Sequence, residues 1–168
     1  MLLERGEAMI RIPLSNGHCA IVDDMDADRL RGYKWCAGKS RKRIYAMATV
    51  YRPQKKTVYM HCLLMEKPKG TFIDHANGNG LDNRRENLRI ATRSQNQANR
   101  GVPRNNTSGL KGVYWQESHR GWKAAIYVNR KRIHAGLFKD KNDAGRAYDA
   151  LAIEHYGEFA YLNFPKQP

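Results

Sequence analysis

Alternating hydrophobic and polar positions predict short β-strands in the first part of the chain. Residues 9–22 (MIRIPLSNGHCAIV) form two such segments around a turn at residues 15–17, which is typical of a β-hairpin. Residues 43–51 (RIYAMATVY) alternate strictly enough to predict another strand. Residues 57–65 (TVYMHCLLM) form a compact apolar segment, in which His61 is expected to be a structural histidine.

Two charged runs interrupt these segments. An acidic run at residues 23–28 suggests a short helix whose N-terminus carries negative charge. Helix capping and solvated charge are favoured over a metal site, because no other cluster of metal ligands adjoins the run. The aspartates concerned are Asp23, Asp24, Asp26 and Asp28. For the basic turn at residues 39–43, solvation and contact with phosphate both remain open.

The segment at residues 71–100 (TFIDHANGNGLDNRRENLRIATRSQNQANR) predicts a strand, a loop, a second strand and a helix. The two strands are expected to pair antiparallel. Thr92 and Gln95 have the spacing of a capping box, so the helix should begin at about Arg93. Asn96 would then lie in the first turn of this helix, facing back toward the strand that carries Asp74.

The pattern changes again in the last part of the chain. Residues 101–108 (GVPRNNTS) predict a linker. Three short strands are expected at residues 111–116, 122–129 and 131–137. An amphipathic helix should follow, with Asp140 as its N-cap and Gly157 as its C-terminal stop. Strand alternation predicts which residues of the strands pack on the helix: Trp122, Ala124, Ile126, Val128, Ile133, Ala135 and Leu137.

Charge indicates the class of partner. The 168 residues include 30 Lys and Arg against 16 Asp and Glu, a formal net charge of +14. Such an excess attracts the phosphate backbone of nucleic acids. Apolar runs of membrane-spanning length and a signal peptide are both missing from the sequence, so we expect a cytoplasmic protein.

The three cysteines are Cys19, Cys36 and Cys62, and none of them forms a CxxC pair. An odd number at these spacings argues against a disulfide framework and against a structural zinc site. We therefore expect reduced, buried thiols.

Residue types in the 71–100 segment suit phosphodiester hydrolysis with a metal ion. A carboxylate such as Asp74 and an amide oxygen such as Asn96 are hard ligands that suit Mg²⁺ or Mn²⁺. The neighbouring His75 titrates near neutrality and can accept a proton from an attacking water molecule. The expected cofactor is therefore Mg²⁺ or Mn²⁺, and no organic cofactor is implied.

The same segment resembles the HNH endonucleases with the ββα-metal fold, especially homing endonucleases of bacteriophages. The matching motifs are Asp74-His75, Gly78-Asn79, Asp82-Asn83-Arg84, Glu86-Asn87-Leu88-Arg89 and Thr92-Arg93-Ser94-Gln95-Asn96. The resemblance implies that His75 is the general base, that Asp74 and Asn96 bind the metal, and that Asn87 braces the loop and positions His75. Basic residues around the motif are expected to contact DNA phosphates: Arg84, Arg85, Arg89 and Arg93.

Residues 109–165 resemble the APETALA/ethylene-response-factor DNA-binding domain, a three-stranded antiparallel sheet packed on one helix. The matching segments begin at Lys111, Trp122, Gly136, Ala147 and Leu162. In that family the exposed face of the sheet enters the major groove. Strand alternation places the remaining side chains on the exposed face, where we expect them to contact DNA: Tyr114, Gln116, Lys123, Tyr127, Arg132 and His134. Lys111 and Arg130 are expected at the edges of the sheet.

Together these features predict an α+β protein. Residues 1–55 would form a β-rich N-terminal extension, 56–100 a ββα-metal (HNH) nuclease core, 101–108 a linker and 109–168 the DNA-binding domain. The expected function is metal-dependent cleavage of double-stranded DNA by a monomeric homing-type enzyme, in a bacterial or phage-infected cell. Neither a membrane nor a protein partner is implied. The alternative is a non-catalytic, sequence-specific DNA-binding regulator with a degenerate nuclease module.

Overall fold

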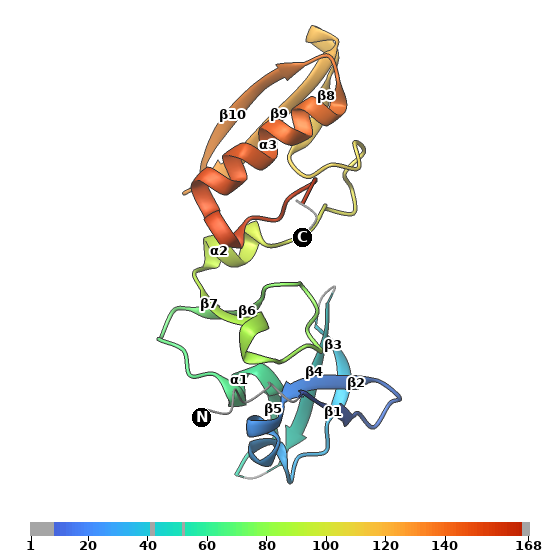
Figure 1. The fold of residues 1–168 in the computed structure, drawn as a ribbon, viewed down its shortest axis with the longest axis vertical. Helices are drawn as coiled ribbons and strands as arrows, with labels where there is room; N and C mark the ends of the chain where they lie inside the picture. The colour runs from blue at the N-terminus through green and yellow to red at the C-terminus, as the bar shows by residue number, and fades with distance from the viewer. Residues whose placement is uncertain (1–8, 41–42, 52, 166–168) are drawn as a thin grey trace, which may run out of the picture. The chain divides into compact units, whose positions relative to one another are not determined.

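The computed structural model describes residues 9–40, 43–51 and 53–165, so Arg41 and Lys42 of the predicted basic turn lie outside the described residues. Strands and helices are mixed along the chain, as expected for an α+β protein (Figure 1). The chain divides into two compact units, residues 1–91 and residues 92–168. The described helices are too short or too polar to cross a membrane.

The N-terminal unit begins with the predicted hairpin. Strands β1 (Met9–Pro13) and β2 (Cys19–Asp23) pair antiparallel. Gly17 in the connecting turn has φ of +80°, a conformation that glycine adopts without a steric penalty. Two 3₁₀ turns follow, η1 (Asp24–Asp26) and η2 (Asp28–Leu30), where the sequence predicted a short helix.

A three-stranded antiparallel sheet comes next. Its order is β3 (Cys36–Ser40), β4 (Arg43–Val50) and β5 (Lys56–Tyr59). The predicted strand at residues 43–51 is confirmed, and its buried face carries Ala46 and Ala48. The apolar segment after it continues into the short helix α1 (Met60–Leu64), which buries Met60 and Leu64.

The last elements of this unit are the two strands expected around the polar loop. Strands β6 (Phe72–His75) and β7 (Leu88–Ala91) pair antiparallel, and the 3₁₀ turn η3 (Arg85–Asn87) leads into β7. The loop between them joins the first hairpin, because Ile21 N–H donates to the Leu81 carbonyl at 2.8 Å. The Ile21 carbonyl accepts from Asn83 N–H at 2.7 Å.

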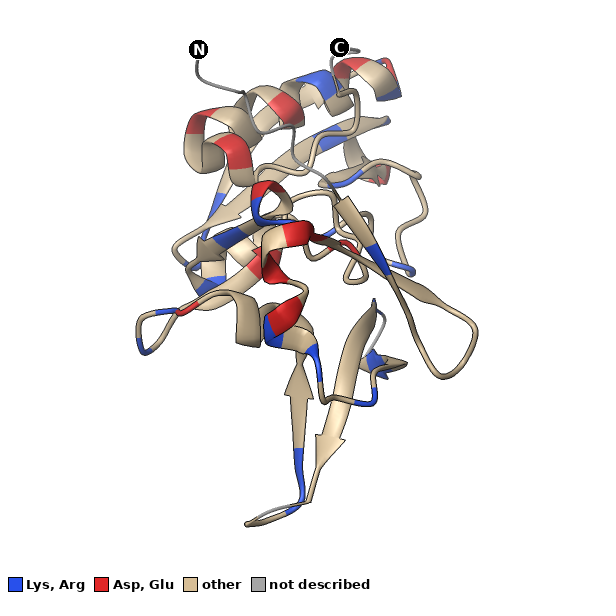
Figure 2. Cartoon of the chain, turned by 60° about the horizontal axis from the view of Figure 1, so that its bottom comes forward, with Lys and Arg blue, Asp and Glu red and all other residues tan. Residues whose placement is uncertain are grey.

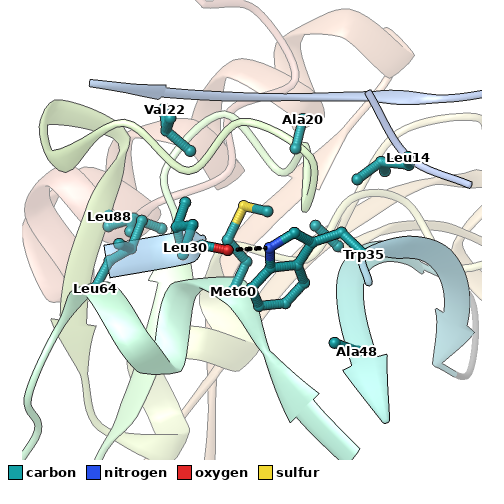
Figure 3. Close-up of a cluster of buried hydrophobic side chains, with 10 residues drawn as sticks. Leu14, Ala20, Val22, Leu30, Trp35, Ala48, Met60, Leu64 and Leu88 are labelled. Atoms are coloured by element: carbon teal, nitrogen blue, oxygen red, sulfur yellow. Dashed lines mark hydrogen bonds between the residues drawn. The ribbon is translucent and has the colours of Figure 1, made fainter. Parts of the chain in front are cut away.

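One hydrophobic core holds the whole N-terminal unit together (Figure 3). Trp35 lies in it with its indole N–H donating to the Leu30 carbonyl at 3.1 Å, so the one polar atom of this ring is satisfied. Val22 of β2 and Leu88 of β7 belong to the same cluster. The predicted extension and the first part of the predicted nuclease core therefore share a single core.

The three cysteines are free thiols, but the prediction that they are buried is wrong. Cys19 and Cys62 are exposed, and Cys36 is half-buried. Cys19 lies at the start of a β-strand and Cys62 on the outward side of α1, so neither position faces the core.

The C-terminal unit begins with helix α2 (Arg93–Ala98), which starts where the sequence predicted. The capping box is formed in both directions. Gln95 N–H donates to Thr92 Oγ1 at 3.2 Å, and Thr92 N–H donates to Gln95 Oε1 at 2.8 Å. These bonds satisfy two of the donors that a helix N-terminus leaves without an intrahelical partner.

A three-stranded antiparallel sheet packs on the long helix α3 (Lys141–Tyr156), as expected. The strands β8 (Val113–Gln116), β9 (Gly121–Val128) and β10 (Lys131–Phe138) lie in the order β10-β9-β8. Asp140 caps the helix, because its Oδ1 accepts from Asn142 N–H at 2.7 Å and from Asp143 N–H at 3.1 Å. Gly157 ends it with φ of +52°.

One inward-facing position was predicted wrongly. A β-bulge between His134 and Gly136 shifts the register of β10 by one residue. After the bulge, Phe138 lies opposite Trp122 and packs against the core, whereas Leu137 is 44% exposed beside Lys123. A one-residue slip exchanges the two faces of a strand, and simple alternation does not anticipate it.

The segment predicted as a linker is a hydrogen-bonded loop of the C-terminal unit. Ser108 is buried, and its hydroxyl donates to the Val113 carbonyl at 2.8 Å. The Asn106 side chain accepts from Gly109 N–H at 2.7 Å and donates to the Leu110 carbonyl at 2.9 Å. The Asn and Ser side chains that indicated a loop therefore build fixed turns.

We expect Gly112→Ala to destabilise the C-terminal unit more than Gly109→Ala does. Both glycines have positive φ, so alanine costs about 1–2 kcal/mol of backbone strain at either position. A Cβ at Gly112 would also strike the buried Tyr148 ring and come within 2.7 Å of the Ala125 carbonyl, whereas a Cβ at Gly109 meets nothing within 4 Å. Overpacking should add roughly 1–3 kcal/mol, measurable by urea unfolding. Equal losses would contradict the tight contact.

Candidate active site and nucleic-acid interface

Asp74 and His75 end strand β6, and both side chains are almost fully buried. Asp74 lies directly across from Arg89 on β7. Its Oδ2 accepts from Arg89 Nη2 at 3.0 Å and from Nε at 3.2 Å. Arg43 Nη1 lies 3.9 Å from Oδ1. Two guanidinium groups therefore balance the charge of this buried carboxylate.

His75 lies in a cluster of aromatic rings. The ring centres of His61 and His75 are 5.0 Å apart in an edge-to-face arrangement, and Tyr45 lies 5.7 Å from His75. His75 Nε2 is 3.4 Å from Asn83 Oδ1, an oxygen that can only accept, so the imidazole N–H points to it. Burial lowers the pKa of His75, and the Asn83 contact offsets part of that effect. The imidazole is therefore neutral at pH 7.

His61 has no hydrogen-bond partner for its Nδ1 among the described residues. Burial lowers its pKa to about 3, with the neighbouring His75 adding to the effect. The ring packs against Tyr45 and Tyr59, as expected of a structural histidine.

Asn87 ties the polar loop together from its place in η3. Its amide Nδ2 donates to the Asp82 carbonyl at 2.7 Å, and its Oδ1 accepts from Asn77 N–H at 2.9 Å. The Asp82 carboxylate accepts from Arg84 Nη2 at 2.8 Å and from Asn77 Nδ2 at 2.9 Å. The hydrogen bond from Arg84 is the main cause of the lowered pKa of Asp82. Hydrogen bonds thus join Asn77, Asp82, Arg84 and Asn87 within the loop.

Asp26 corrects the interpretation of the acidic run as solvated, helix-capping charge. It is 1% exposed, and it forms a bidentate pair with Arg85, whose Nε and Nη2 each lie 2.7 Å from a carboxylate oxygen. The hydrogen bond from Arg85 lowers the pKa of Asp26. Asp23 accepts from Arg85 backbone N–H at 2.7 Å, and no cap bond to a side chain is present in η1 or η2. The partner lies 59 residues away, which local sequence patterns do not reveal.

Three of the four arginines that were expected to contact DNA phosphates take part in such ion pairs. Arg84 is paired with Asp82, Arg85 with Asp26, and Arg89 with Asp74. Each guanidinium therefore has a structural partner in the N-terminal unit. Arg93 differs, because it is exposed on α2. Contact of all four with DNA stays a prediction.

The two residues assigned to the metal suit a hard divalent cation by donor type. Asp74 supplies carboxylate oxygens, and Asn96 supplies an amide oxygen in the first turn of α2, where it is half-buried. Within the described residues, no group of three or more His, Cys, Asp or Glu side chains gathers as a metal cluster. By donor type, each of these two side chains alone suits Mg²⁺ or Mn²⁺ better than zinc.

One face of the C-terminal sheet turns away from α3 and carries the residues expected to read DNA. Strand register places on it Tyr114, Gln116, Lys123, Tyr127, Arg132 and His134. The Arg132 guanidinium lies over the rings of Tyr114 and Tyr127, at 4.7 and 5.8 Å from their centres. Among the described residues, this face carries no acidic side chain, whereas α3 carries both acidic and basic residues, coloured red and blue in Figure 2. We name these six residues the reading face.

Lys111 and Arg130 were expected at the edges of the sheet. Arg130 is exposed in the turn between β9 and β10, with φ of +65°. Lys111 is instead half-buried, and its ammonium donates to the carbonyl of Ala98 in α2 and lies 5.3 Å from the centre of the Tyr161 ring. Burial lowers the pKa of Lys111 to about 8. Its position suits an internal tether better than an edge contact.

The C-terminal unit contains a groove with a volume of about 940 Å³, which the sequence patterns did not predict. Arg93 and Gln97 of α2 line it together with Tyr127 and Arg132 of the reading face. Tyr156, at the end of α3, also borders it and contributes its hydroxyl to both α2 and β9. From the sequence, Tyr156 could be recognised only as an apolar position at helical spacing, and its two hydrogen bonds could not be predicted.

Comparisons with known proteins agree with these features. A model of the HNH endonuclease family matches residues 66–98. Protein 3.8 of Escherichia phage T7 is 40% identical over 65 residues, covering 39% of this chain and 54% of the phage protein. An uncharacterized HNH endonuclease of Acanthamoeba polyphaga mimivirus is 30% identical over 133 residues, covering 78% of this chain and 67% of that protein. The chain belongs to the HNH endonuclease family.

Plant proteins provide the second similarity. An AP2/ERF and B3 domain-containing protein of Oryza sativa subsp. japonica is 42% identical over 59 residues, which is 35% of this chain and 16% of the plant protein. The chain is thus a distant homologue of AP2/ERF DNA-binding domains. It spans about half the length of the phage protein and two thirds of the mimivirus protein. HNH nucleases generally use a divalent metal, and both similarities imply binding to DNA.

We expect the metal-free N-terminal unit to lose stability as the pH falls below 6.5, because His61 must stay neutral in the folded state. Its pKa of about 3 lies below the unfolded value of 6.5, so the unfolded chain takes up the proton first. The free energy of unfolding should therefore drop by about 1.4 kcal/mol per pH unit for this residue. Lowered Asp26 and Asp82 pKa values add their own loss only below about 4.

Urea titrations at pH 4.5, 5.5 and 6.5 would measure this slope. His61→Phe keeps the ring packing against Tyr45 and Tyr59 and should remove the contribution. Thr57→Ala, at an exposed position in β5 that carries no titratable group, should leave the slope unchanged. The same slope in His61→Phe and wild type would contradict the assignment.

Proposed function

We propose that this protein is a divalent-metal-dependent endonuclease that hydrolyses phosphodiester bonds in double-stranded DNA. The observation that carries the proposal is the buried Asp74-His75 pair, held by a loop that Asn87 closes, inside the region matched by the HNH family. The strands β6 and β7 followed by α2 correspond in this proposal to the ββα-metal nuclease core.

The proposed chemistry assigns one task to each residue. His75 takes the proton from the attacking water, for which its neutral imidazole is prepared by burial. Asp74 and Asn96 hold Mg²⁺ or Mn²⁺, which when bound stabilises negative charge on the phosphate and on the leaving 3′ oxygen. Asn87 keeps the loop closed, so that the His75 backbone and ring stay in place.

Arg89 gives the Asp74 site a further property. The guanidinium holds two hydrogen bonds to Asp74 Oδ2 and so keeps this buried carboxylate in a fixed orientation. A cation at Asp74 would share the carboxylate with Arg89.

The reading face supplies the proposed sequence preference. Planar and cationic side chains on a β-sheet suit the major groove, and Arg132 is presented by the rings of Tyr114 and Tyr127. We propose that Arg93 of α2 and Arg130, in the turn between β9 and β10, add contacts to DNA phosphates. With one active site per chain, a monomer would nick one strand, as a homing-type enzyme in a bacterial or phage-infected cell.

Cleavage of supercoiled plasmid with Mg²⁺ or Mn²⁺ tests the proposal. We expect wild type to nick the plasmid and His75→Ala to lose roughly 10²-fold or more in rate, because general base catalysis contributes about that much. His18→Ala, at an exposed position in the first hairpin, should cleave like wild type. Equal rates for His75→Ala and wild type would remove the base assignment. Tight DNA binding with no cleavage by wild type would favour the non-catalytic regulator.

A salt titration tests the reading face. Arg132→Gln should weaken DNA binding roughly tenfold or more, and it should lower the slope of log K against log salt by about one if Arg132 contacts a phosphate. Arg146→Gln is the matched control, since this exposed arginine lies on α3 and pairs with Asp143. Gel-shift assays at several salt concentrations would measure both variants. Equal binding by Arg132→Gln and Arg146→Gln would contradict the proposed interface.

A further inference from the structure

Helix α2 is too short to be stable by itself. It has six residues, and isolated helices below about 12–15 residues are marginal in water. It nevertheless carries Asn96, whose proposed role requires a fixed position. The contacts that hold α2 in the C-terminal unit therefore matter for that role.

The first contact is made by the Tyr156 hydroxyl at the end of α3. The hydroxyl donates to the Tyr127 carbonyl of β9 at 2.6 Å, and it lies 3.1 Å from Ser94 Oγ of α2. Because the hydroxyl proton is used by the carbonyl, Ser94 is the donor in the second bond. Tyr127 is 63% exposed on the reading face, so one phenol joins the first turn of α2 to a DNA-reading strand.

The second contact holds the other end of the helix. The Ala98 carbonyl accepts from Tyr161 N–H at 3.3 Å and from the Lys111 ammonium. Carbonyls in the last turn of a helix lack intrahelical donors, so these two groups satisfy one that would otherwise need water. Lys111 precedes β8 in sequence and is fixed in turn by Asn163, whose Oδ1 accepts from Lys111 N–H at 2.7 Å.

Asn96 lies two residues after Ser94 and two residues before Ala98, so it is bracketed by the two contacts. We infer that Tyr156 and Lys111 are positioning residues, which hold the ligand-bearing helix α2 in register with the reading face. This inference rests on the proposed role of Asn96 as a metal ligand. The DNA-reading sheet and α2 then behave as one rigid piece of the nuclease.

The inference predicts a particular separation of effects. Removing the Tyr156 hydroxyl keeps every side chain of the reading face, and of the proposed DNA contacts only Arg93 lies on α2, so the affinity for DNA should fall much less than the affinity for metal. The hydrogen bond between Tyr156 and Ser94 of α2 is lost, so α2 should loosen and the affinity for metal should fall about tenfold. A merely structural role in the fold would instead lower the affinity for metal and the affinity for DNA to a similar extent.

The experiment compares the full-length wild type with Tyr156→Phe. Hydrogen exchange of the amides of residues 95–99 reports on α2 without metal, and Mn²⁺ binding is measured by electron paramagnetic resonance. DNA affinity is measured without metal. Tyr161→Phe is the matched control, since the Tyr161 hydroxyl makes no hydrogen bond within the described residues and the ring under Lys111 is kept.

We expect Tyr156→Phe to show faster exchange in α2, about tenfold weaker Mn²⁺ binding and a much smaller loss of DNA affinity, with Tyr161→Phe like wild type. Wild-type exchange and Mn²⁺ affinity in Tyr156→Phe would overturn the inference. If Tyr156→Phe unfolds, Ser94→Ala removes only the α2 side of the bridge and is read in the same way.

Failure of the proposed function would look different. If wild type neither binds Mn²⁺ nor cleaves DNA, Asn96 is not a ligand, and the inference falls with that role even when α2 exchanges faster. If wild type binds and cleaves while Tyr156→Phe matches it in every measurement, the proposed function stands and only the inference is lost.

Discussion

A polar loop can be buried only if its hydrogen-bonding groups find partners inside the protein, and this constraint shapes the N-terminal unit. Asn87 supplies the central solution, because its one amide group serves the backbone at Asn77 and at Asp82. The loop can then stay closed against β6, which presents Asp74 and His75. Without such bonds, each buried orphan group would cost about 1–3 kcal/mol.

The strands before the loop are part of the same solution. The backbone of Ile21 pairs with the loop at Leu81 and Asn83, and the carboxylate of Asp26 fixes Arg85 at its end. The predicted N-terminal extension therefore packs against the candidate catalytic loop and is hydrogen-bonded to it. In the C-terminal unit, Tyr156 has a comparable role, because a single side chain connects two elements through hydrogen bonds.

Most elements near the candidate site could be predicted from local patterns. The capping box at Thr92, the Asp140 cap and the period-two strands are short-range signals, and the structure has these elements at the expected places. The exposed side of the C-terminal sheet was also correct as far as His134. It failed at Leu137, because a bulge depends on how two strands fit each other rather than on the residues of one.

Three features can be read from the chain alone: the order of Asp74, His75 and Asn96, which are proposed as metal ligands and base, the basic charge, and the side chains that alternate onto one face of the last sheet. These depend on residue type and on spacings within one element. The partners of those groups emerge only when the chain is folded. Arg85 reaches Asp26 and Lys111 reaches Ala98 because folding brings distant segments together, and burial then makes each ion pair or hydrogen bond necessary.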